Sequence, residues 1–199
     1  MSSRDQILKA VAANQPEYVK LPDTKVFETN VQGSLEKFET VLSLVGGKVF
    51  YISDFAEITK LILEWHGTTA RIVSPLKELT EFNKGNLGYI SHVREFHNVE
   101  VAIISAHFGV AENGAVWVTG DEMQYRVLPF ICQHLAVIIH AGAIVPTMHK
   151  AYELISNADY GFGTFIAGPS KTADIEQSLV IGAHGPRSMT VFVMNSQER

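Results

Sequence analysis

The sequence predicts an α/β fold built around a largely parallel sheet. Short apolar runs with the character of strands alternate along the chain with longer segments whose apolar residues recur at helical spacing. Such alternation is typical of parallel sheets, in which a crossover helix connects one strand to the next. Of the 199 residues, 46% are hydrophobic, which is enough to bury a core between layers. We expect one domain over residues 1–199, in which residues 1–33 form an N-terminal helix and an extended arm.

Four longer helices are expected, and two of them begin at a recognisable cap. The first covers residues 4–14, and the second runs from the N-cap Ser34 to a glycine pair. Asp54, followed three residues later by Glu57, resembles a capping box and predicts the start of the third helix. Residues 147–156 carry apolar side chains at helical spacing and predict the fourth.

We expect strands at residues 48–52, 71–73, 99–106, 116–119, 135–139, 162–167 and 188–195. The run over residues 99–106 is almost continuously apolar, which is typical of a strand covered on both faces, so we place it at the centre of the sheet. The strands on either side of residues 184–187 predict an antiparallel C-terminal portion.

Composition excludes several classes of partner. The net charge is −5 and the basic residues are scattered, so the chain lacks the positive patch that nucleic acids and anionic membranes require. The first residues lack the apolar segment of a secretory signal, and no apolar run approaches the roughly 20 residues that span a bilayer. We therefore expect a cytoplasmic protein that binds neither nucleic acid nor membrane.

Cys132 is the only cysteine, so neither an internal disulfide nor an iron–sulfur cluster held by this chain's own thiolates is expected. Its neighbours are apolar, which favours a buried packing role, and a nucleophile is the alternative. The glycine-rich motifs of dinucleotide and nucleotide phosphate binding do not occur. We expect no cofactor in this chain.

The histidines do not show the spacing of a metal site. His134 and His140 lie at the two ends of one expected strand, about 20 Å apart, and cannot share an ion. His92 and His97 lie in an irregular region, and no His-Glu-x-x-His pattern occurs. Because the histidines are so dispersed in the sequence, we expect no metal.

A polar loop between two expected strands is the main candidate ligand site. The candidate ligand-binding residues are Ser170, Lys171, Thr172, Asp174, His184 and Arg187. Thr172 would cap a short helix beginning near Ala173, and the N-terminus of that helix would favour an anion. The alternative is structural: Ser170 and Thr172 then serve a strand-to-helix turn, Asp174 offsets the helix dipole, and His184 and Arg187 belong to a hairpin turn.

Glu112 is the candidate catalytic residue. It precedes Asn113-Gly114, a strong turn signal, and lies between apolar segments that would partly desolvate its carboxylate. A carboxylate in such a place can act as a base or a nucleophile. A solvated loop glutamate is the alternative.

Several of these segments resemble a known family. Residues 168–176 (GPSKTADIE) and 179–187 (LVIGAHGPR) resemble the C-terminal signature of the lactate utilization protein C family, also called the LUD domain. Residues 108–114 (FGVAENG) resemble the family's Ala-Glu-Thr-Gly segment, with Asn113 in the place of the usual threonine. The resemblance is specific over residues 99–193.

The resemblance implies a three-layer α/β/α fold similar to the sugar-isomerase and CoA-transferase superfamily. It also implies a part in the oxidation of L-lactate to pyruvate, as a non-redox subunit beside iron–sulfur partner proteins. A free-standing isomerase or transferase acting on a small phosphorylated, carboxylated or CoA-linked substrate is the alternative. A small anionic ligand is expected in either case, and the sequence leaves a homo-oligomer open.

Overall fold

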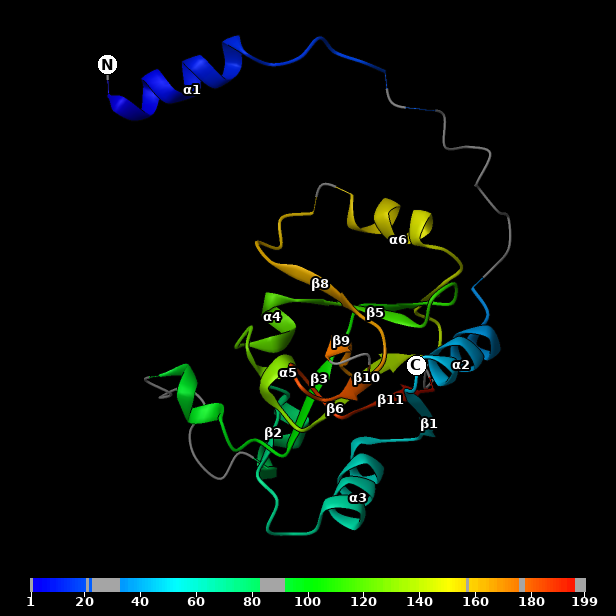
Figure 1. Ribbon diagram of the computed structural model, residues 1–199. Helices are drawn as coiled ribbons and strands as arrows, with labels where there is room; N and C mark the ends of the chain where they lie inside the picture. The colour runs from blue at the N-terminus through cyan, green and yellow to red at the C-terminus, as the bar shows by residue number, and fades with distance from the viewer. Residues whose placement is uncertain are drawn as a thin grey trace.

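A five-stranded sheet, in which every pair of neighbouring strands is parallel, forms the centre of the computed structural model (Figure 1). The structure describes residues 2–20, 22, 33–82, 92–156, 158–175 and 178–195. Across the sheet the strands are β1 (Lys48–Ile52), β11 (Ser188–Met194), β6 (His134–His140), β3 (Val101–Ser105) and β2 (Ile72–Val73). The parallel sheet is confirmed. Its middle strand is β6, whereas the predicted central run, β3, pairs with β6 on one side and β2 on the other.

Helices cover both faces of this sheet. On one face α3 (Phe55–His66) buries Ile58 and Ile62, beside the 3-10 segment η2 (Lys77–Phe82). On the other face α2 (Leu35–Leu44) buries two side chains in a larger core shared with β3, β6 and β11. This layering explains why the parallel strands are apolar on both sides.

A second, four-stranded sheet lies between the parallel sheet and α6 (Met148–Ile155) (Figure 1). Its strands, in spatial order, are β7 (Ile144–Val145), β4 (Phe108–Val110), β5 (Ala115–Thr119) and β8 (Gly163–Ile166). Gly114, with φ 69°, makes the tight turn between β4 and β5. Two of the expected strands therefore belong to a separate, mainly antiparallel sheet.

The segment after Ser170 is a hairpin, so the helix expected near Ala173 is wrong. Strands β9 (Lys171–Ile175) and β10 (Ser178–Ile181) pair antiparallel, with Thr172 opposite Val180. Valine, isoleucine and threonine recur in these strands, and such β-branched residues favour strands over helices. Thr172 therefore caps no helix. The antiparallel part is this hairpin, whereas β11 after it runs parallel to both of its neighbours.

The caps predicted at Ser34 and Asp54 are confirmed, because their side chains accept backbone hydrogen bonds from the first turns of α2 and α3. Thr147, which the sequence analysis did not name as a cap, does the same for α6. Helix α1 (Ser3–Ala13) begins at a capping box of Ser2 and Asp5, and none of its residues is buried. The remaining short helices are α4 (Gly120–Met123), α5 (Leu128–Ile131) and the 3-10 segment η4 (Val93–Phe96). Within the described ranges, no helix has both the length and the apolarity needed to cross a membrane.

Candidate functional site

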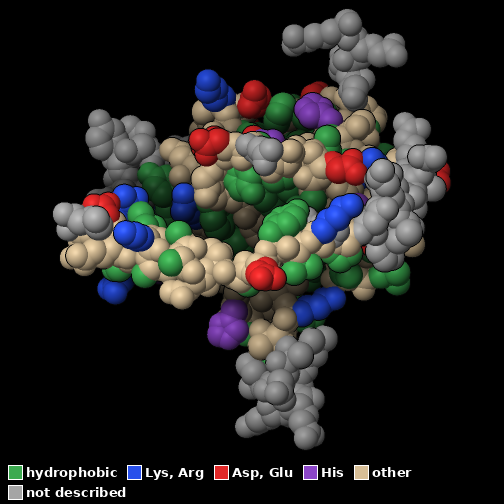
Figure 2. All heavy atoms as spheres, turned by 90° about the horizontal axis from the view of Figure 1, so that it is seen from above, with side chains coloured by type: hydrophobic (Ala, Val, Ile, Leu, Met, Phe, Trp, Pro, Cys, Tyr) green, Lys and Arg blue, Asp and Glu red, His purple; other side chains and the backbone are tan. Residues whose placement is uncertain are grey.

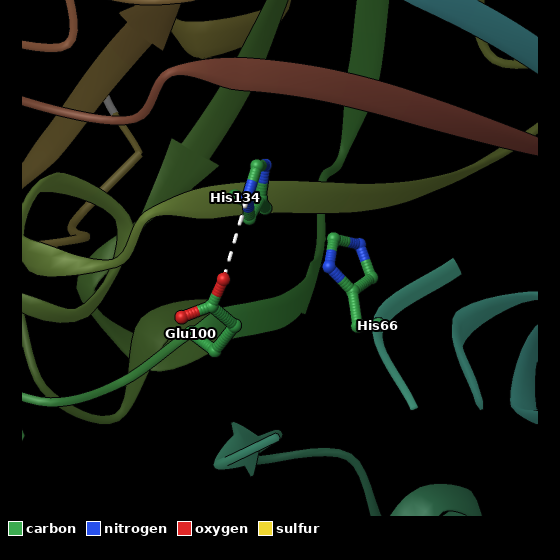
Figure 3. A group of neighbouring side chains, drawn as sticks. All are labelled: His66, Glu100 and His134. Carbon is green, nitrogen blue, oxygen red and sulfur yellow. Dashed lines mark ion pairs between the residues drawn. The ribbon is translucent and has the colours of Figure 1, made fainter. Parts of the chain in front are cut away.

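Three metal-type donor residues meet at the amino end of the parallel sheet. His66 is the last residue of α3, Glu100 lies just before β3, and His134 is the first residue of β6. One donor atom from each side chain lies within 4.8 Å of the other two. Figure 3 shows the three side chains directed toward a common space from separate elements. The expectation of no metal rested on the dispersal of the histidines, and that ground is wrong because folding brings together His66 and His134.

The backbone holds these residues in place. The N–H of Glu100 donates to the carbonyl of Arg71 at 2.9 Å, and the N–H of His134 donates to the carbonyl of Glu100 at 2.8 Å. The Nε2 atom of His134 lies 3.5 Å from a carboxylate oxygen of Glu100. On its other side, His134 Nδ1 is hydrogen-bonded to the hydroxyl of Ser188 at 2.7 Å. The cluster is therefore tied to the ordered ends of neighbouring strands.

The electrostatics of the cluster favour neutral imidazoles. Burial lowers the pKa of His66, and the neighbouring ring of His134, 4.6 Å away between centroids, lowers it further. Burial also lowers the pKa of His134; Glu100 acts against this, and Arg187 adds to it. Neutral imidazoles can accept a proton or bind a metal ion. Because Arg187 contributes to the lowered pKa of His134, this residue of the predicted loop lies close enough to the cluster to affect its electrostatics.

A cavity of about 380 Å³ lies beyond the opposite, carboxyl end of β3. Its apolar wall includes Phe108, Trp117 and Ile155, between the second sheet and α6. Figure 2 views the molecule from the side on which α6 lies and shows hydrophobic side chains gathered around a hollow in that face. A hollow of this size with an apolar wall and a few polar groups is typical of a small-molecule site.

A few polar groups border the cavity. His107 Nε2 and the buried hydroxyl of Thr119 are joined by a hydrogen bond of 2.9 Å, and the carboxylates of Asp121 and Asp159 also line the hollow. Nearby, the hydroxyl of Ser105 donates to the carboxylate of Glu122. The sequence reasoning missed this group. The signal that could have found it is the polar pair Ser105 and His107, directly after an apolar strand.

The structure brings the two halves of the predicted loop together. The N–H of Ser170 donates to the carbonyl of Pro186 at 2.8 Å, and the carbonyl of Ser170 accepts from Gly182 at 3.0 Å. A side chain at Gly182 would collide with Arg187, since an added Cβ would lie 2.5 Å from its Cγ. The side chains of Lys171, His184 and Arg187 are exposed and that of Thr172 is half-buried. The structure does not describe the side chain of Asp174, so its predicted role stays a prediction.

This loop lies at the amino end of β11, since the N–H of Arg187 donates to the carbonyl of Gln133, just before β6, at 2.8 Å. It therefore neighbours the histidine cluster rather than the carboxyl-end cavity. Its role as an anion site stays a prediction, but one supporting reason, a helix N-terminus at Ala173, is removed by the β9–β10 hairpin.

Glu112 lies elsewhere, at the turn between β4 and β5. Its side chain is exposed, and its carboxylate accepts the backbone N–H of Met148, the first residue of α6, at 2.7 Å. A carboxylate at the N-terminus of a helix stabilises the helix dipole. The structure therefore shows a structural contact for Glu112, and its catalytic role stays a prediction.

Cys132 is 1% exposed, which confirms the expected buried position. Burial raises the pKa of its thiol to about 12. The thiolate needed for nucleophilic attack is therefore scarce at neutral pH.

The architecture is that of an α/β protein with a parallel sheet and a candidate site at each end of that sheet. Comparison with known proteins shows the family to which the chain belongs. The fold is similar to the crystal structure of a DUF162 family protein from Deinococcus radiodurans, with a TM-score of 0.57 and 19% sequence identity, covering 80% of this chain and 95% of that chain. The family model of the LUD domain matches residues 91–194, slightly more than half of the sequence. The chain belongs to the LUD domain family.

Several of its curated relatives are named lactate utilization protein C. The one from Anoxybacillus flavithermus is 35% identical over 44% of this chain and 40% of the relative, and the one from Bacillus pumilus is 31% identical over 48% and 42%. The one from a Geobacillus species is 27% identical over 98% of this chain and 80% of that protein. In the first two, the matched segment spans about two fifths of the relative's length.

Proposed function

We propose that this chain works in lactate utilization, as a non-redox subunit of a system that oxidises L-lactate to pyruvate with iron–sulfur partner proteins. The observation that carries the proposal is the similarity to the Geobacillus lactate utilization protein C, which extends over 98% of this chain. Membership of the LUD domain family supports the same conclusion from an independent family model.

The cysteine content supports the non-redox part. Oxidation of lactate to pyruvate releases electrons that an acceptor must take up, and protein-bound clusters are normally held by about four thiolates. This chain has one cysteine, and its thiol is buried with a pKa raised to about 12. Within the proposal, the clusters therefore reside in partner proteins.

The loop of residues 168–187 is our candidate for the small anionic ligand. Lys171 and Arg187 are exposed cations, and the hydrogen bond between Ser170 and Pro186 holds their two segments together. An arginine can bind a carboxylate through two parallel hydrogen bonds. L-lactate and pyruvate both carry such a carboxylate.

Deletion of the gene in the organism that encodes this chain tests the proposal. The deletion strain should lose growth on L-lactate, retain growth on pyruvate, and recover on L-lactate when the gene is restored. An affinity-tagged chain, purified anaerobically after growth on lactate, should bring down iron-containing proteins that are absent from an untagged control. Undiminished growth of the deletion strain on L-lactate would refute the proposed role.

The cavity at the carboxyl end of β3 favours a second candidate, a free-standing isomerase or transferase acting on a small phosphorylated, carboxylated or CoA-linked substrate. A cavity of about 380 Å³ falls in the size range of small-molecule sites. A melting-temperature screen with sugar phosphates, CoA thioesters, lactate and pyruvate tests it, because a ligand that binds the native state raises stability by mass action. Stabilisation by a sugar phosphate or CoA thioester that His107→Ala abolishes would favour this candidate, and stabilisation by lactate alone would disfavour it.

A further inference from the structure

We propose that His66, Glu100 and His134 form a binding site for a divalent transition-metal ion, with zinc as the ion that fits the donor set best. The inference goes beyond the proposed role in lactate utilization and does not depend on it. The site lies at the amino end of the parallel sheet, where α3 ends and β3 and β6 begin (Figure 3).

The geometry is close to that of a bound ion. Zinc–nitrogen and zinc–oxygen bonds of about 2.0–2.1 Å in a tetrahedral site place neighbouring donor atoms about 3.3 Å apart. His134 Nε2 and the Glu100 carboxylate are already 3.5 Å apart. The third donor atom, from His66, lies within 4.8 Å of both. To complete a tetrahedral set, this atom would have to come closer to the other two by up to about 1.5 Å.

The donor chemistry is that of a transition metal. Two imidazoles and one carboxylate occur together in zinc and iron(II) sites, whereas calcium and magnesium prefer sites made of oxygen atoms. The side chains of His134 and Glu100 are 28% and 44% exposed, so water can reach an ion held between them. Three protein ligands with solvent access leave a coordination position open, which is the pattern of catalytic rather than structural zinc.

The surroundings prepare His134 as a ligand. In metal sites a ligating histidine donates its second ring N–H to an oxygen acceptor, which orients the ring and selects the tautomer. The hydroxyl of Ser188, 2.7 Å from His134 Nδ1, is such an acceptor. In the tautomer in which Nδ1 carries the proton, Nε2, which lies 3.5 Å from the Glu100 carboxylate, is the nitrogen that can bind an ion.

An ordinary ion pair between His134 and Glu100 accounts less well for the cluster. Such a pair involves only two of the three side chains and leaves the approach of His66 unexplained. The ring of His66 lies 4.6 Å from that of His134, between centroids, and one donor atom of His66 lies within 4.8 Å of a donor atom of each of the other two residues.

The test is direct titration of the purified, chelator-stripped full chain with zinc, followed by calorimetry with a competing chelator. Cobalt(II), monitored by its visible absorption, serves as a spectroscopic probe of the same ligands. We expect one ion per chain. His66→Ala and Glu100→Gln should weaken binding by more than the 10- to 100-fold typical for loss of an outer hydrogen-bond partner, and Ser188→Ala should weaken it by about that factor.

His140→Ala is the matched control. His140 lies at the other end of the same strand and is exposed, so its loss should leave zinc affinity unchanged. Circular dichroism and the metal-free melting temperature establish whether each variant is folded. If His66→Ala does not fold, Glu100→Gln, which keeps the size of the side chain, still tests the site. Equal affinity in wild type, His66→Ala and Glu100→Gln, or an absence of stoichiometric binding in wild type, overturns the proposal. Because this experiment measures metal binding, a negative result would refute the metal site alone. The proposed role in lactate utilization is tested separately, by growth of the deletion strain on L-lactate.

Discussion

At the amino end of the parallel sheet three donor atoms lie within 4.8 Å of one another, whereas at the carboxyl end the polar groups are spread around a cavity of about 380 Å³. The amino end is built from strand starts joined by backbone hydrogen bonds, and the carboxyl end is closed by a second sheet and α6. The first arrangement suits a single ion and the second a small molecule. The difference shows that the two ends of one sheet can carry different kinds of candidate site, a cluster of metal donors at one end and a small-molecule cavity at the other.

The largest expected effect concerns the packing beneath the amino end, where Cys132 precedes β6. Because burial raises the pKa of its thiol to about 12, the thiolate fraction at pH 8 is about 1,000-fold smaller in the native than in the unfolded protein, so the native protein should react with a disulfide reagent much more slowly. The measurement is the rate of thiol release with and without denaturant. Comparable rates would mean that the amino end opens readily.

At the carboxyl end, Trp117→Ala should cost about 3–5 kcal/mol of unfolding free energy, the range for truncating a buried large aromatic side chain. Trp117 is 7% exposed, and its ring lies 4.6 Å from that of Phe165 and 5.4 Å from that of Tyr160, between centroids. Urea unfolding measures the loss. Trp65→Ala is the matched control near the amino end: Trp65 is 39% exposed, so its loss should be smaller. If Trp65→Ala lowered the unfolding free energy more than Trp117→Ala, Trp117 would not be the more strongly stabilising of the two side chains.

Ligand binding can assign the anion to one end. If the loop near the amino end binds lactate or pyruvate, Arg187→Ala should weaken binding by about 1.5–3 kcal/mol, the range for a hydrogen bond to a charged group, and His107→Ala should not. Calorimetric titration of both variants with lactate, pyruvate and phosphate measures the effect. Loss of binding in His107→Ala alone would move the anion to the cavity. Equal binding by wild type and Arg187→Ala would make the loop a structural turn.

Removing one histidine hydrogen bond at each end allows the two ends to be compared through smaller changes in unfolding free energy. Ser188→Ala removes the partner of His134 at the amino end, and Thr119→Val removes the partner of His107 at the carboxyl end. Each should cost about 0.5–1.5 kcal/mol, the usual net value of one hydrogen bond. Urea unfolding in the presence of a chelator gives both values without a contribution from metal. A loss above that range at one end only would show that its polar network is coupled.

The smallest effect is expected for Glu112→Gln. The substitution keeps the shape of the side chain that accepts the N–H of Met148 and removes its charge at the N-terminus of α6. The expected loss is about 0.3–1 kcal/mol, which is the usual helix-dipole contribution. Thermal unfolding at low and high salt measures it, and the difference should shrink at high salt. Loss of an enzymatic activity with unchanged stability would instead restore Glu112 as a catalytic residue.

Much of the fold could be predicted from the sequence because its signals are local. The caps Ser34 and Asp54 and the apolar run of β3 depend on residues a few positions apart, and all are found where expected. Partners distant in the sequence were harder to predict. The apolar pattern of β5 identifies a strand but not its sheet, and the turn residues after Gly168 fit a hairpin as well as a helix start.

By itself the sequence determined the alternation of strands and helices, the burial of Cys132 and the resemblance to the LUD domain, because each depends on residue types or on spacing along the chain. Only the tertiary structure decided which residues form a site. His66 and His134 are 68 positions apart, and they meet with Glu100 because the strand order places β3 beside β6 and packs α3 on that face. Strand order is a property of the whole core, so spacing in the sequence could not reveal that cluster.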